Sequence, residues 1–453
     1  MAEIPHSATA AATPPAPADA RDGRNAGSLD RRRLFDRLRA TRAGTEMLVA
    51  PLGPEDQNLQ SKPEVSPAKW HRAHTSWFFE TFVLGEFLPG YEPFHPAFAE
   101  LFNSYYNGVG RQHPRPRRSL LSRPDAETVT RYRAHVDDAL EALFETAADE
   151  RFDRFAGLVE LGIAHEQQHQ ELILTDLKHA FSFNPLAPAL GQGPDDRQGG
   201  MKTGMAAPDW FGFDGGQVQI GARADDGFCF DNETPRHTVY LNQPFELAGR
   251  PVTCGEYAEF VDDGGYREPM LWLSDGWAWV QENGIDAPLY WHGDREDRQI
   301  YTLAGRRPPA PAEPVVHLNF YEAAAFAEWA GARLPTEAEW EAAAAAQPLH
   351  GQFADSGRYH PAPVASPAGG DDGPAAMFGT VWEWTASAYG PYPGFRPAPG
   401  AVGEYNGKFM ANQMVLRGGS CATPAGHIRA GYRNFFYPPD RWQFTGLRLA
   451  RDA

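Results

Sequence analysis

The chain has 453 residues, of which 42% are hydrophobic and 22% are charged, as in a globular protein of two or three domains. Its formal net charge of -18 argues against a nucleic-acid partner, because phosphates are bound by clustered Lys and Arg. No apolar run reaches membrane-spanning length, and three scattered cysteines offer no disulfide framework. We therefore expect a cytoplasmic protein with neither a membrane nor a nucleic-acid partner.

The first part of the chain, residues 1–27, is rich in Ala, Pro and Asp, and we expect it to be a disordered tail. A helical spacing of leucines follows, with Ser28 as the expected N-cap. A second apolar helix is predicted over residues 67–84. Ser66 would cap this helix, and Pro67 would take its first helical position.

The run HEQQHQELIL, residues 165–174, lies in a further predicted helix over 152–183. His165 and His169 are four residues apart, so both imidazoles lie on one helical face and can reach one metal ion. By itself such a pair is more often two ordinary histidines on a solvated face. His74 lies on the apolar face of the second predicted helix and provides a third inward imidazole. The sequence therefore predicts a three-histidine metal centre.

A helix over residues 125–150 completes a predicted four-helix bundle over residues 28–184, and the core of such a bundle is a usual place for metal ligands. The loop that crosses from the second helix to the third contains Tyr105 and Tyr106, followed by a basic, proline-rich run. The arginines of that run fit a solvated loop and an anion site for a substrate carboxylate equally well.

The C-terminal part changes character after a Pro- and Gly-rich linker predicted over residues 185–207. From residue 208 to 453 the pattern is short and strand-like, with dense turns and many tryptophans. Two helices are predicted there, one over residues 321–330 and one after Thr336. Thr336 and Glu339 have the spacing of a capping box at the start of the second helix.

Three runs of this part are recognisable: PVVHLNFYEAAAFAEWAGARLPTEAEWEAAA, FGTVWEWTAS and VLRGGSCATPAGHIRAGYR. Together they resemble the formylglycine-generating-enzyme (sulfatase-modifying-factor) fold, an irregular α+β domain related to C-type lectins. Active members of that family carry paired copper-binding cysteines near the C-terminus. Here the stretch 446–450 reads GLRLA, with no cysteine, so formylglycine chemistry is not expected.

The N-terminal half resembles the DinB-like metal-binding bundles, and the fold class implied for the chain is α+β, with a DinB-like four-helix bundle joined to a formylglycine-generating-enzyme-like domain. This combination, with the run HEQQH, resembles the hercynine sulfoxide synthases (hercynine oxygenases) of ergothioneine biosynthesis. These are non-haem iron(II) enzymes that use O2. The resemblance implies that His74, His165 and His169 bind iron. It implies that hercynine, which is trimethyl-histidine, contacts Gln168 and the run Asn434, Phe435 and Phe436.

One departure from the family bears on the sulfur donor. Members that use γ-glutamylcysteine have an Asn-Trp-Asp run followed four residues later by Arg, whereas here Phe436 replaces that Asp and Asp440 replaces that Arg. The paired tyrosines are instead similar to those of members that use free cysteine. This likeness implies Tyr105 or Tyr106 as the proton donor. It also implies a cysteine carboxylate held by Arg115 and Arg123.

We therefore expect an iron(II)- and O2-dependent sulfoxide synthase that joins the sulfur of cysteine to C2 of hercynine. Three imidazoles on one face of an iron ion leave positions for both reactants and O2, and a quaternary ammonium is recognised by aromatic faces. Three alternatives remain open. They are a selenoneine synthase that uses a selenosugar, a zinc- or nickel-dependent thiol transferase of the DinB class, and a binding module without catalysis.

Overall fold

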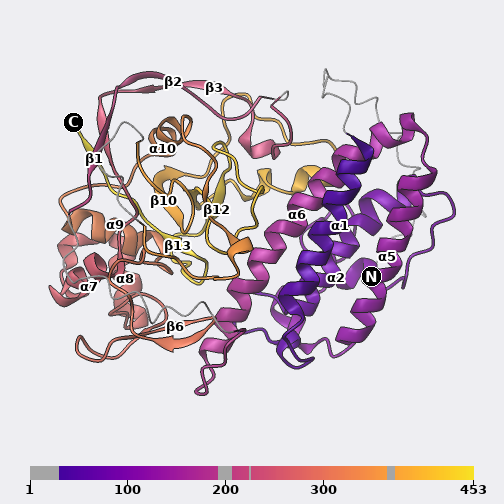
Figure 1. Cartoon of the computed structure of the whole chain (residues 1–453), viewed down its shortest axis with the longest axis horizontal. Helices are drawn as coiled ribbons and strands as arrows, with labels where there is room; N and C mark the ends of the chain where they lie inside the picture. The colour runs from indigo at the N-terminus through magenta and orange to yellow at the C-terminus, as the bar shows by residue number, and fades with distance from the viewer. Residues whose placement is uncertain (1–29, 192–206, 224–225, 365–372) are drawn as a thin grey trace, which may run out of the picture.

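The computed structural model describes residues 30–191, 207–223, 226–364 and 373–453. A bundle of long helices lies beside an irregular α+β domain, and the longest helix, α6 (Asp149–Ser182), lies at the boundary between them (Figure 1). This confirms the predicted fold class. The predicted tail, Ser28 and most of the predicted linker lie outside the described residues. In the described part of the chain, no helix has the length and apolar character needed to cross a membrane.

Two predicted helix starts are wrong. Helix α1 (Arg31–Val49) is capped by Asp30, whose carboxylate accepts from the N–H groups of Arg32 and Arg33 at 3.0 and 3.2 Å. Helix α2 (Ala68–Phe79) starts after Pro67, which occupies the N-cap position and offers no side-chain cap. Ser66 does not cap this helix. Its hydroxyl accepts a hydrogen bond from Arg118, and its N–H group donates to Asp176.

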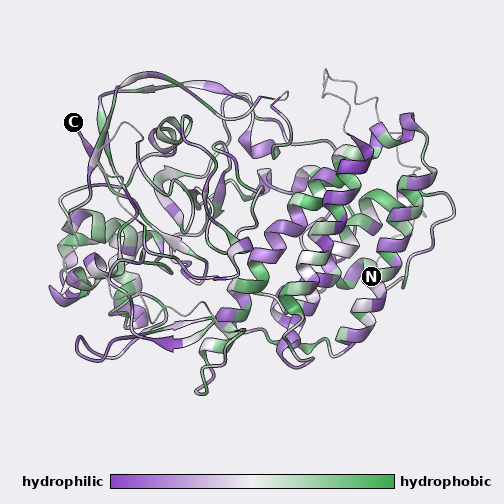
Figure 2. Ribbon diagram, in the orientation of Figure 1, coloured by the Kyte–Doolittle hydropathy of each residue, from purple (hydrophilic) through white to green (hydrophobic). Residues whose placement is uncertain are grey.

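The bundle packs α1 and α2 against α5 (Ala126–Thr146) and α6, and hydrophobic and hydrophilic stretches alternate along all four helices (Figure 2). Gly162 lets α6 approach α2 closely, because a Cβ there would lie 2.3 Å from a ring carbon of Phe79. Helix α2 continues into a π-helical turn, Glu80–Leu84, and two short helices follow, α3 (Gly85–Phe87) and α4 (Phe98–Leu101).

The C-terminal domain is built from small sheets. Its central sheet has the order β12-β11-β10-β13, in which only the β10–β13 pair is parallel. The remaining strands form the antiparallel sheet β1-β4-β14, the hairpin β2-β3, the sheet β5-β6-β7 and the short pair β8-β9. The strands are β1 (Trp210–Phe213), β2 (Gly216–Ile220), β3 (His237–Leu241), β4 (Phe245–Ala248), β5 (Trp291–His292), β6 (Gln299–Thr302), β7 (Gly305–Arg307), β8 (Gly351–Gln352), β9 (Phe378–Gly379), β10 (Trp382–Ala388), β11 (Met414–Arg417), β12 (Asn434–Phe436), β13 (Thr445–Gly446) and β14 (Ala450–Asp452).

The described part of this domain also has four α-helices, of which α10 packs on the strands: α7 (Cys254–Asp262), α8 (Ser274–Asn283), α9 (Phe320–Trp329) and α10 (Glu337–Ala344). Helices α9 and α10 confirm the two predicted helices. The predicted capping box is present, since Thr336 Oγ1 accepts from the Glu339 N–H group and the Glu339 carboxylate accepts from the Thr336 N–H group. Helices α7 and α8 were not predicted, because the chain around them is dense in turn residues and tryptophans.

Helix α6 joins the two halves through a buried carboxylate. Glu171 accepts hydrogen bonds from Trp382 Nε1 at 2.8 Å, Ser420 Oγ at 2.5 Å and Thr423 Oγ1 at 2.6 Å, all from the C-terminal domain. One helical turn away on the opposite side, Glu166 faces the bundle. It accepts from Arg42 Nη1 at 3.0 Å, Thr45 Oγ1 at 2.7 Å and Arg133 Nη2 at 2.8 Å.

The Glu166 cluster makes a testable contribution to stability. Burial alone would raise the pKa of Glu166, but Arg133 and Arg42 outweigh burial and lower the pKa from 4.5 to about 2. We expect Glu166→Gln to lower the free energy of unfolding by about 3–5 kcal/mol at pH 7, because two buried guanidinium groups lose a partner. The loss is measured by chemical denaturation followed by circular dichroism.

Two comparisons sharpen this prediction. The stabilisation by Glu166 is present above pH 4.5 and is lost as the pH falls from 4.5 toward 2, so the variant and the wild type should converge in that window. Glu160 lies on the same helix as Glu166 and forms a more exposed ion pair with Arg37 of α1. Glu160→Gln removes that pair and should lower the free energy of unfolding by less than about 1 kcal/mol. Equal losses for both variants would contradict the structural role of Glu166.

Candidate metal centre

Three histidines converge where α6 faces α2. His74 comes from α2, and His165 and His169 come from successive turns of α6. One ligand-capable atom from each residue lies within 4.8 Å of the others, and the ring centroids are 4.6 to 4.9 Å apart. The structure therefore brings together the three histidines that the sequence predicted to converge.

The ring nitrogens of this triad are suited to a metal ion. His74 Nδ1 donates to the carbonyl of Phe102 at 2.5 Å, which leaves a lone pair on Nε2. That Nε2 atom is buried and has no hydrogen-bond partner among the described residues, and the same is true of both ring nitrogens of His165. Buried polar atoms without partners are rare in proteins, and a bound metal ion would satisfy them. Imidazole nitrogens suit iron, zinc, copper and nickel, so the donor set fits a transition metal.

The triad is held in its neutral, ligating form. Burial lowers the pKa of His165 to about 3. Burial, and then the neighbouring histidines, lower the pKa of His74 and that of His169 well below the usual range. All three imidazoles are therefore uncharged at pH 7, and no proton needs to be displaced when a metal ion binds.

Two tryptophans fix the ring plane of His74. Trp70 stacks on it at a centroid distance of 4.6 Å and an interplanar angle of 15°, and Trp77 stacks on it at 5.4 Å and 14°. These residues belong to the apolar face of α2 on which the sequence placed His74. The imidazole is thus oriented by packing as well as by its hydrogen bond to Phe102.

Gln168 lies between two tyrosines of the C-terminal domain. Its amide nitrogen donates to the Tyr432 hydroxyl at 2.6 Å, and its amide oxygen accepts a hydrogen bond from the Tyr405 hydroxyl. The Tyr405 ring lies edge-on to the His165 ring, at a centroid distance of 5.6 Å. The sequence reasoning missed Tyr405, because it lies in an irregular segment with no periodicity to mark an inward side chain.

The predicted tyrosine pair lies on the same side of the bundle. Tyr105 and Tyr106 stack at 4.7 Å, and Tyr106 is fully buried against Trp77 at 5.5 Å. Tyr105 lies edge-on to Tyr405 at 6.3 Å. The C-terminal domain holds the end of this loop, because Glu404 accepts from the N–H groups of residues 107 and 108 at 3.0 and 2.7 Å.

The run from Asn434 to Phe436 forms strand β12. Phe435 stacks on Tyr389 at 4.0 Å, and Phe436 lies edge-on to Trp442 at 5.7 Å. The Asn434 side chain accepts from the N–H group of Phe435 at 2.9 Å. The run contributes two half-buried aromatic rings on the C-terminal side of the domain boundary, and it makes no ring contact with the triad itself.

The arginines of the basic run differ sharply in their surroundings. Arg115 and Arg123 are exposed, and the Arg123 guanidinium donates to the carbonyl of Ser122 at 2.9 Å. Arg118 is buried and lies 3.3 Å above the centroid of the Trp70 ring. It donates to the hydroxyls of Ser66 and Ser104 at 2.8 and 3.3 Å.

Arg118 forms no ion pair with any carboxylate of the described residues, and burial lowers its pKa well below the usual range. The sequence analysis named Arg115 and Arg123, which are exposed, and did not single out Arg118, which is buried. Arg118 lies in a 3-10 turn (Arg115–Leu120), where no apolar periodicity reveals which side chain points inward.

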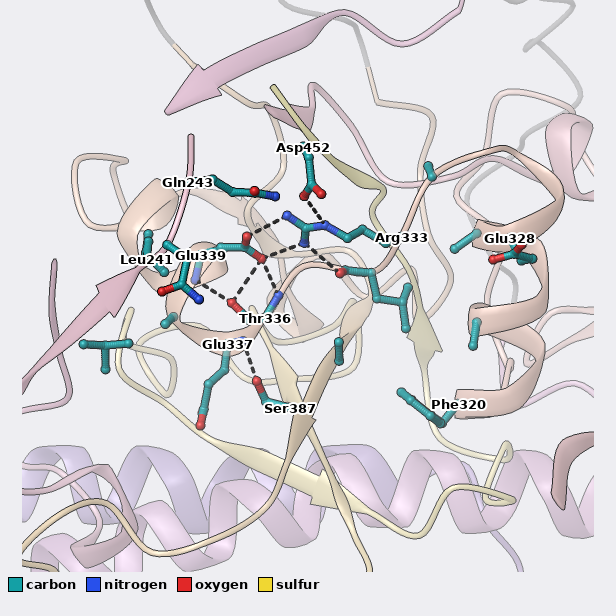
Figure 3. Close-up of a pocket in the computed structure, with 18 of the residues that line it drawn as sticks. Leu241, Gln243, Phe320, Glu328, Arg333, Thr336, Glu337, Glu339, Ser387 and Asp452 are labelled. Carbon is teal, nitrogen blue, oxygen red and sulfur yellow. Dashed lines mark hydrogen bonds and ion pairs between the residues drawn. The ribbon is translucent and has the colours of Figure 1, made fainter. Parts of the chain in front are cut away.

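A cavity of about 1050 Å³ lies in the C-terminal domain, away from these residues (Figure 3). All of its lining residues fall between positions 220 and 452, so no bundle residue reaches it. Inside it, Arg333 pairs with Glu339 at 2.7 Å and with Asp452 at 2.9 Å. These ion pairs tie the start of α10 to the C-terminal strand, and the cavity adds no reactive group to the triad.

Comparisons with known proteins agree with this architecture. Residues 37–173 match the DinB superfamily, and residues 201–453 match the sulfatase-modifying factor enzyme 1-like domain. A hercynine oxygenase of Mycolicibacterium smegmatis is 35% identical over 453 residues, covering 94% of this chain and 100% of that protein. A hercynine oxygenase of Mycobacterium tuberculosis is 36% identical, covering 87% of this chain and 92% of that protein.

Among solved structures, PvdO from Pseudomonas aeruginosa matches with a TM-score of 0.37 and 23% identity, covering 54% of this chain and 95% of that one. These relatives match this chain across both of its halves. The chain therefore belongs to the hercynine oxygenase family of oxidoreductases.

Proposed function

We propose that this protein is an iron(II)- and O2-dependent enzyme that joins the sulfur of cysteine to C2 of the hercynine imidazole, as a sulfoxide, in ergothioneine biosynthesis. The observation that carries the proposal is the buried triad of neutral imidazoles at the domain boundary, within a chain whose full-length relatives are hercynine oxygenases. His74, His165 and His169 would hold the metal ion. Iron bound there would supply coordination sites and redox capacity for the two substrates and O2.

Hercynine recognition has to accommodate a quaternary ammonium, which cannot donate a hydrogen bond. Aromatic faces and carbonyl oxygens attract such a cation. Phe436 supplies a ring beside Trp442 and Phe435 one beside Tyr389, and Asn434 and Gln168 supply amide groups. Gln168 is already oriented by Tyr405 and Tyr432, so its position is set before any substrate binds. A preset polar group loses less entropy on binding than a mobile one.

The carboxylate of the sulfur donor requires a cation. Among the arginines of the basic run, we place Arg118 first, because it is buried above Trp70 and pairs with no carboxylate of the described residues. Arg115 comes second, because it begins the 3-10 turn that contains Arg118. Arg123 comes last, because it lies outside that turn and its guanidinium donates to the carbonyl of Ser122.

The choice of free cysteine over γ-glutamylcysteine rests on Asp440. Burial raises the pKa of this carboxyl to about 6, and Lys62 partly offsets that effect. At neutral pH an ionised Asp440 would repel the extra carboxylate of a γ-glutamyl group. The family members that use γ-glutamylcysteine have an arginine at this position. Free cysteine carries no such group.

The proton donor has to remain protonated at neutral pH. Burial raises the pKa of Tyr105, Tyr106 and Tyr405 above the usual value, so all three keep their hydroxyl protons. Tyr105 and Tyr106 are our first candidates. Tyr405 joins them, because its ring is the one in contact with a triad histidine.

A product analysis tests the proposed reaction. Iron-loaded protein is incubated with hercynine and O2 while cysteine, γ-glutamylcysteine and a selenosugar are offered in parallel. We expect O2 uptake and a hercynyl-cysteine sulfoxide mass with cysteine, and much slower turnover with the other donors. A selenium-containing product in preference would support a selenoneine synthase. Turnover by zinc-loaded protein without O2 uptake would support a thiol transferase and overturn the proposal.

The metal site has a separate test. We expect His74→Ala to abolish stoichiometric Fe(II) binding under anaerobic conditions, because one of the three neutral donors is lost. Iron content is measured by elemental analysis after desalting. His179→Ala is the matched control, since His179 belongs to α6 but bonds to Ser61 instead of joining the triad. Full iron retention by the His74 variant would refute the assignment.

The ranking of the arginines predicts a specific kinetic effect. Arg118→Lys keeps the charge but loses the planar fork, and we expect the KM for cysteine to rise by about 10- to 100-fold, the range for a lost charge-assisted bond. The KM for hercynine should not change. Arg123→Lys serves as the control and should leave both constants unchanged. A larger effect at Arg123 than at Arg118 would reverse the ranking.

A further inference from the structure

His71 has no role in the function proposed above. It is buried next to the triad, and its Nδ1 atom lies 2.7 Å from Nδ1 of His169. Its other ring nitrogen, Nε2, lies 3.1 Å from Oδ2 of Asp176. His71 therefore bridges a triad histidine and a buried carboxylate two helical turns further along α6.

The directions of these hydrogen bonds follow from the groups involved. An ionised carboxylate only accepts, so His71 carries its proton on Nε2 and donates it to Asp176. The Nδ1 atom of neutral His71 is then an acceptor, and His169 donates to it from its own Nδ1. This leaves the lone pair of His169 on Nε2, where a metal ion can use it.

Both carboxylate oxygens of Asp176 accept hydrogen bonds. Its Oδ2 atom also accepts from the backbone N–H group of Ser66 at 2.9 Å. Its Oδ1 atom accepts from Nε1 of Trp442 at 3.1 Å and from the Thr175 hydroxyl at 3.4 Å. The indole and peptide N–H groups can only donate, so neither oxygen can change its role. Trp442 belongs to the C-terminal domain, so this bond crosses the domain boundary.

We propose that Trp442, Asp176 and His71 form a positioning relay that fixes the tautomer and the ring orientation of His169. The relay makes the ligand strength of His169 depend on the docked C-terminal domain. By contrast, His74 is oriented by a carbonyl of the bundle itself, Phe102. The inference deepens the proposed function and rests on the triad being a metal site.

The relay is tested by metal affinity in the full-length protein. Metal-free protein is titrated anaerobically with Fe(II), and with Co(II), whose visible absorption bands report the ligand environment. We expect Asp176→Asn and His71→Phe to weaken binding by about 10- to 100-fold, the range for partners of metal-bound histidines. Trp442→Phe removes one N–H donor and keeps an aromatic ring, and should weaken binding by about 2- to 10-fold.

The Asp176→Asn variant probes the tautomer directly. An amide cannot accept on both sides, so its NH2 group must face either the Trp442 side or the His71 side. Facing His71, it forces the His71 proton onto Nδ1 and the His169 proton onto Nε2, which blocks that atom from the metal. Facing Trp442, it breaks the bond across the boundary. The Co(II) spectrum should therefore change together with the affinity.

Trp382→Phe is the matched control, because it removes the same kind of N–H bond to another α6 carboxylate, Glu171, across the same boundary. We expect it to lower the Tm of the metal-free protein and to leave metal affinity unchanged. Equal affinity losses for Trp382→Phe and Trp442→Phe would overturn the relay in favour of general loosening of the interface. Unchanged affinity in Trp442→Phe and His71→Phe would also overturn it.

Different results would refute the metal site and the relay. If wild-type protein binds no metal, or His74→Ala binds as well as wild type, the proposed metal site is wrong. If wild type binds and the relay variants bind equally well, only the relay is wrong. Circular dichroism of each metal-free variant identifies a misfolded protein, and Trp442→Phe, the mildest change, decides the question if Asp176→Asn does not fold.

Discussion

The rest of the structure depends on how one helix, α6, packs between the helical bundle and the C-terminal domain. Successive residues of an α-helix point about 100° apart, so a single helix can face several environments within two turns. On α6, Glu166 faces the bundle, His165 and His169 face α2, and Glu171 faces the C-terminal domain. Rotating or sliding the helix would leave at least one buried carboxylate without partners, which costs several kcal/mol. The same constraint therefore fixes the triad.

The two carboxylates of α6 are stabilised in different ways. Glu166 is paired with Arg42 and Arg133, and these cations hold its pKa at about 2 in spite of burial. Glu171 meets no cation in the part of the chain that the structure describes, so burial raises its pKa, and hydrogen bonds from Ser420, Thr423 and Trp382 offset that effect only in part. Ion pairs thus hold the carboxylate that faces the bundle, whereas directional hydrogen bonds from neutral donors hold the one that faces the second domain.

Residues whose function follows from local spacing could be predicted from the sequence, and those placed by tertiary contacts could not. His165 and His169 are one helical turn apart, and His74 shares an apolar stripe, so their convergence was visible in the pattern, as was the capping box at Thr336. Ser66 has the sequence signature of an N-cap, yet its groups serve Arg118 and Asp176. No local pattern indicates such long-range partners, and the same holds for the burial of Arg118 and the contact of Tyr405 with His165.

The charge balance of the site argues for anionic ligands. The three ligand-capable groups are neutral imidazoles, so a divalent ion among them would keep its full charge, unlike an ion held by a carboxylate. Arg118 adds a buried positive charge with no acidic partner in the described part of the chain. Glu166 is already neutralised by two arginines, and Asp176 points away from the triad behind His71. A protein of net charge -18 thus encloses a centre short of negative charge, which anionic ligands would supply.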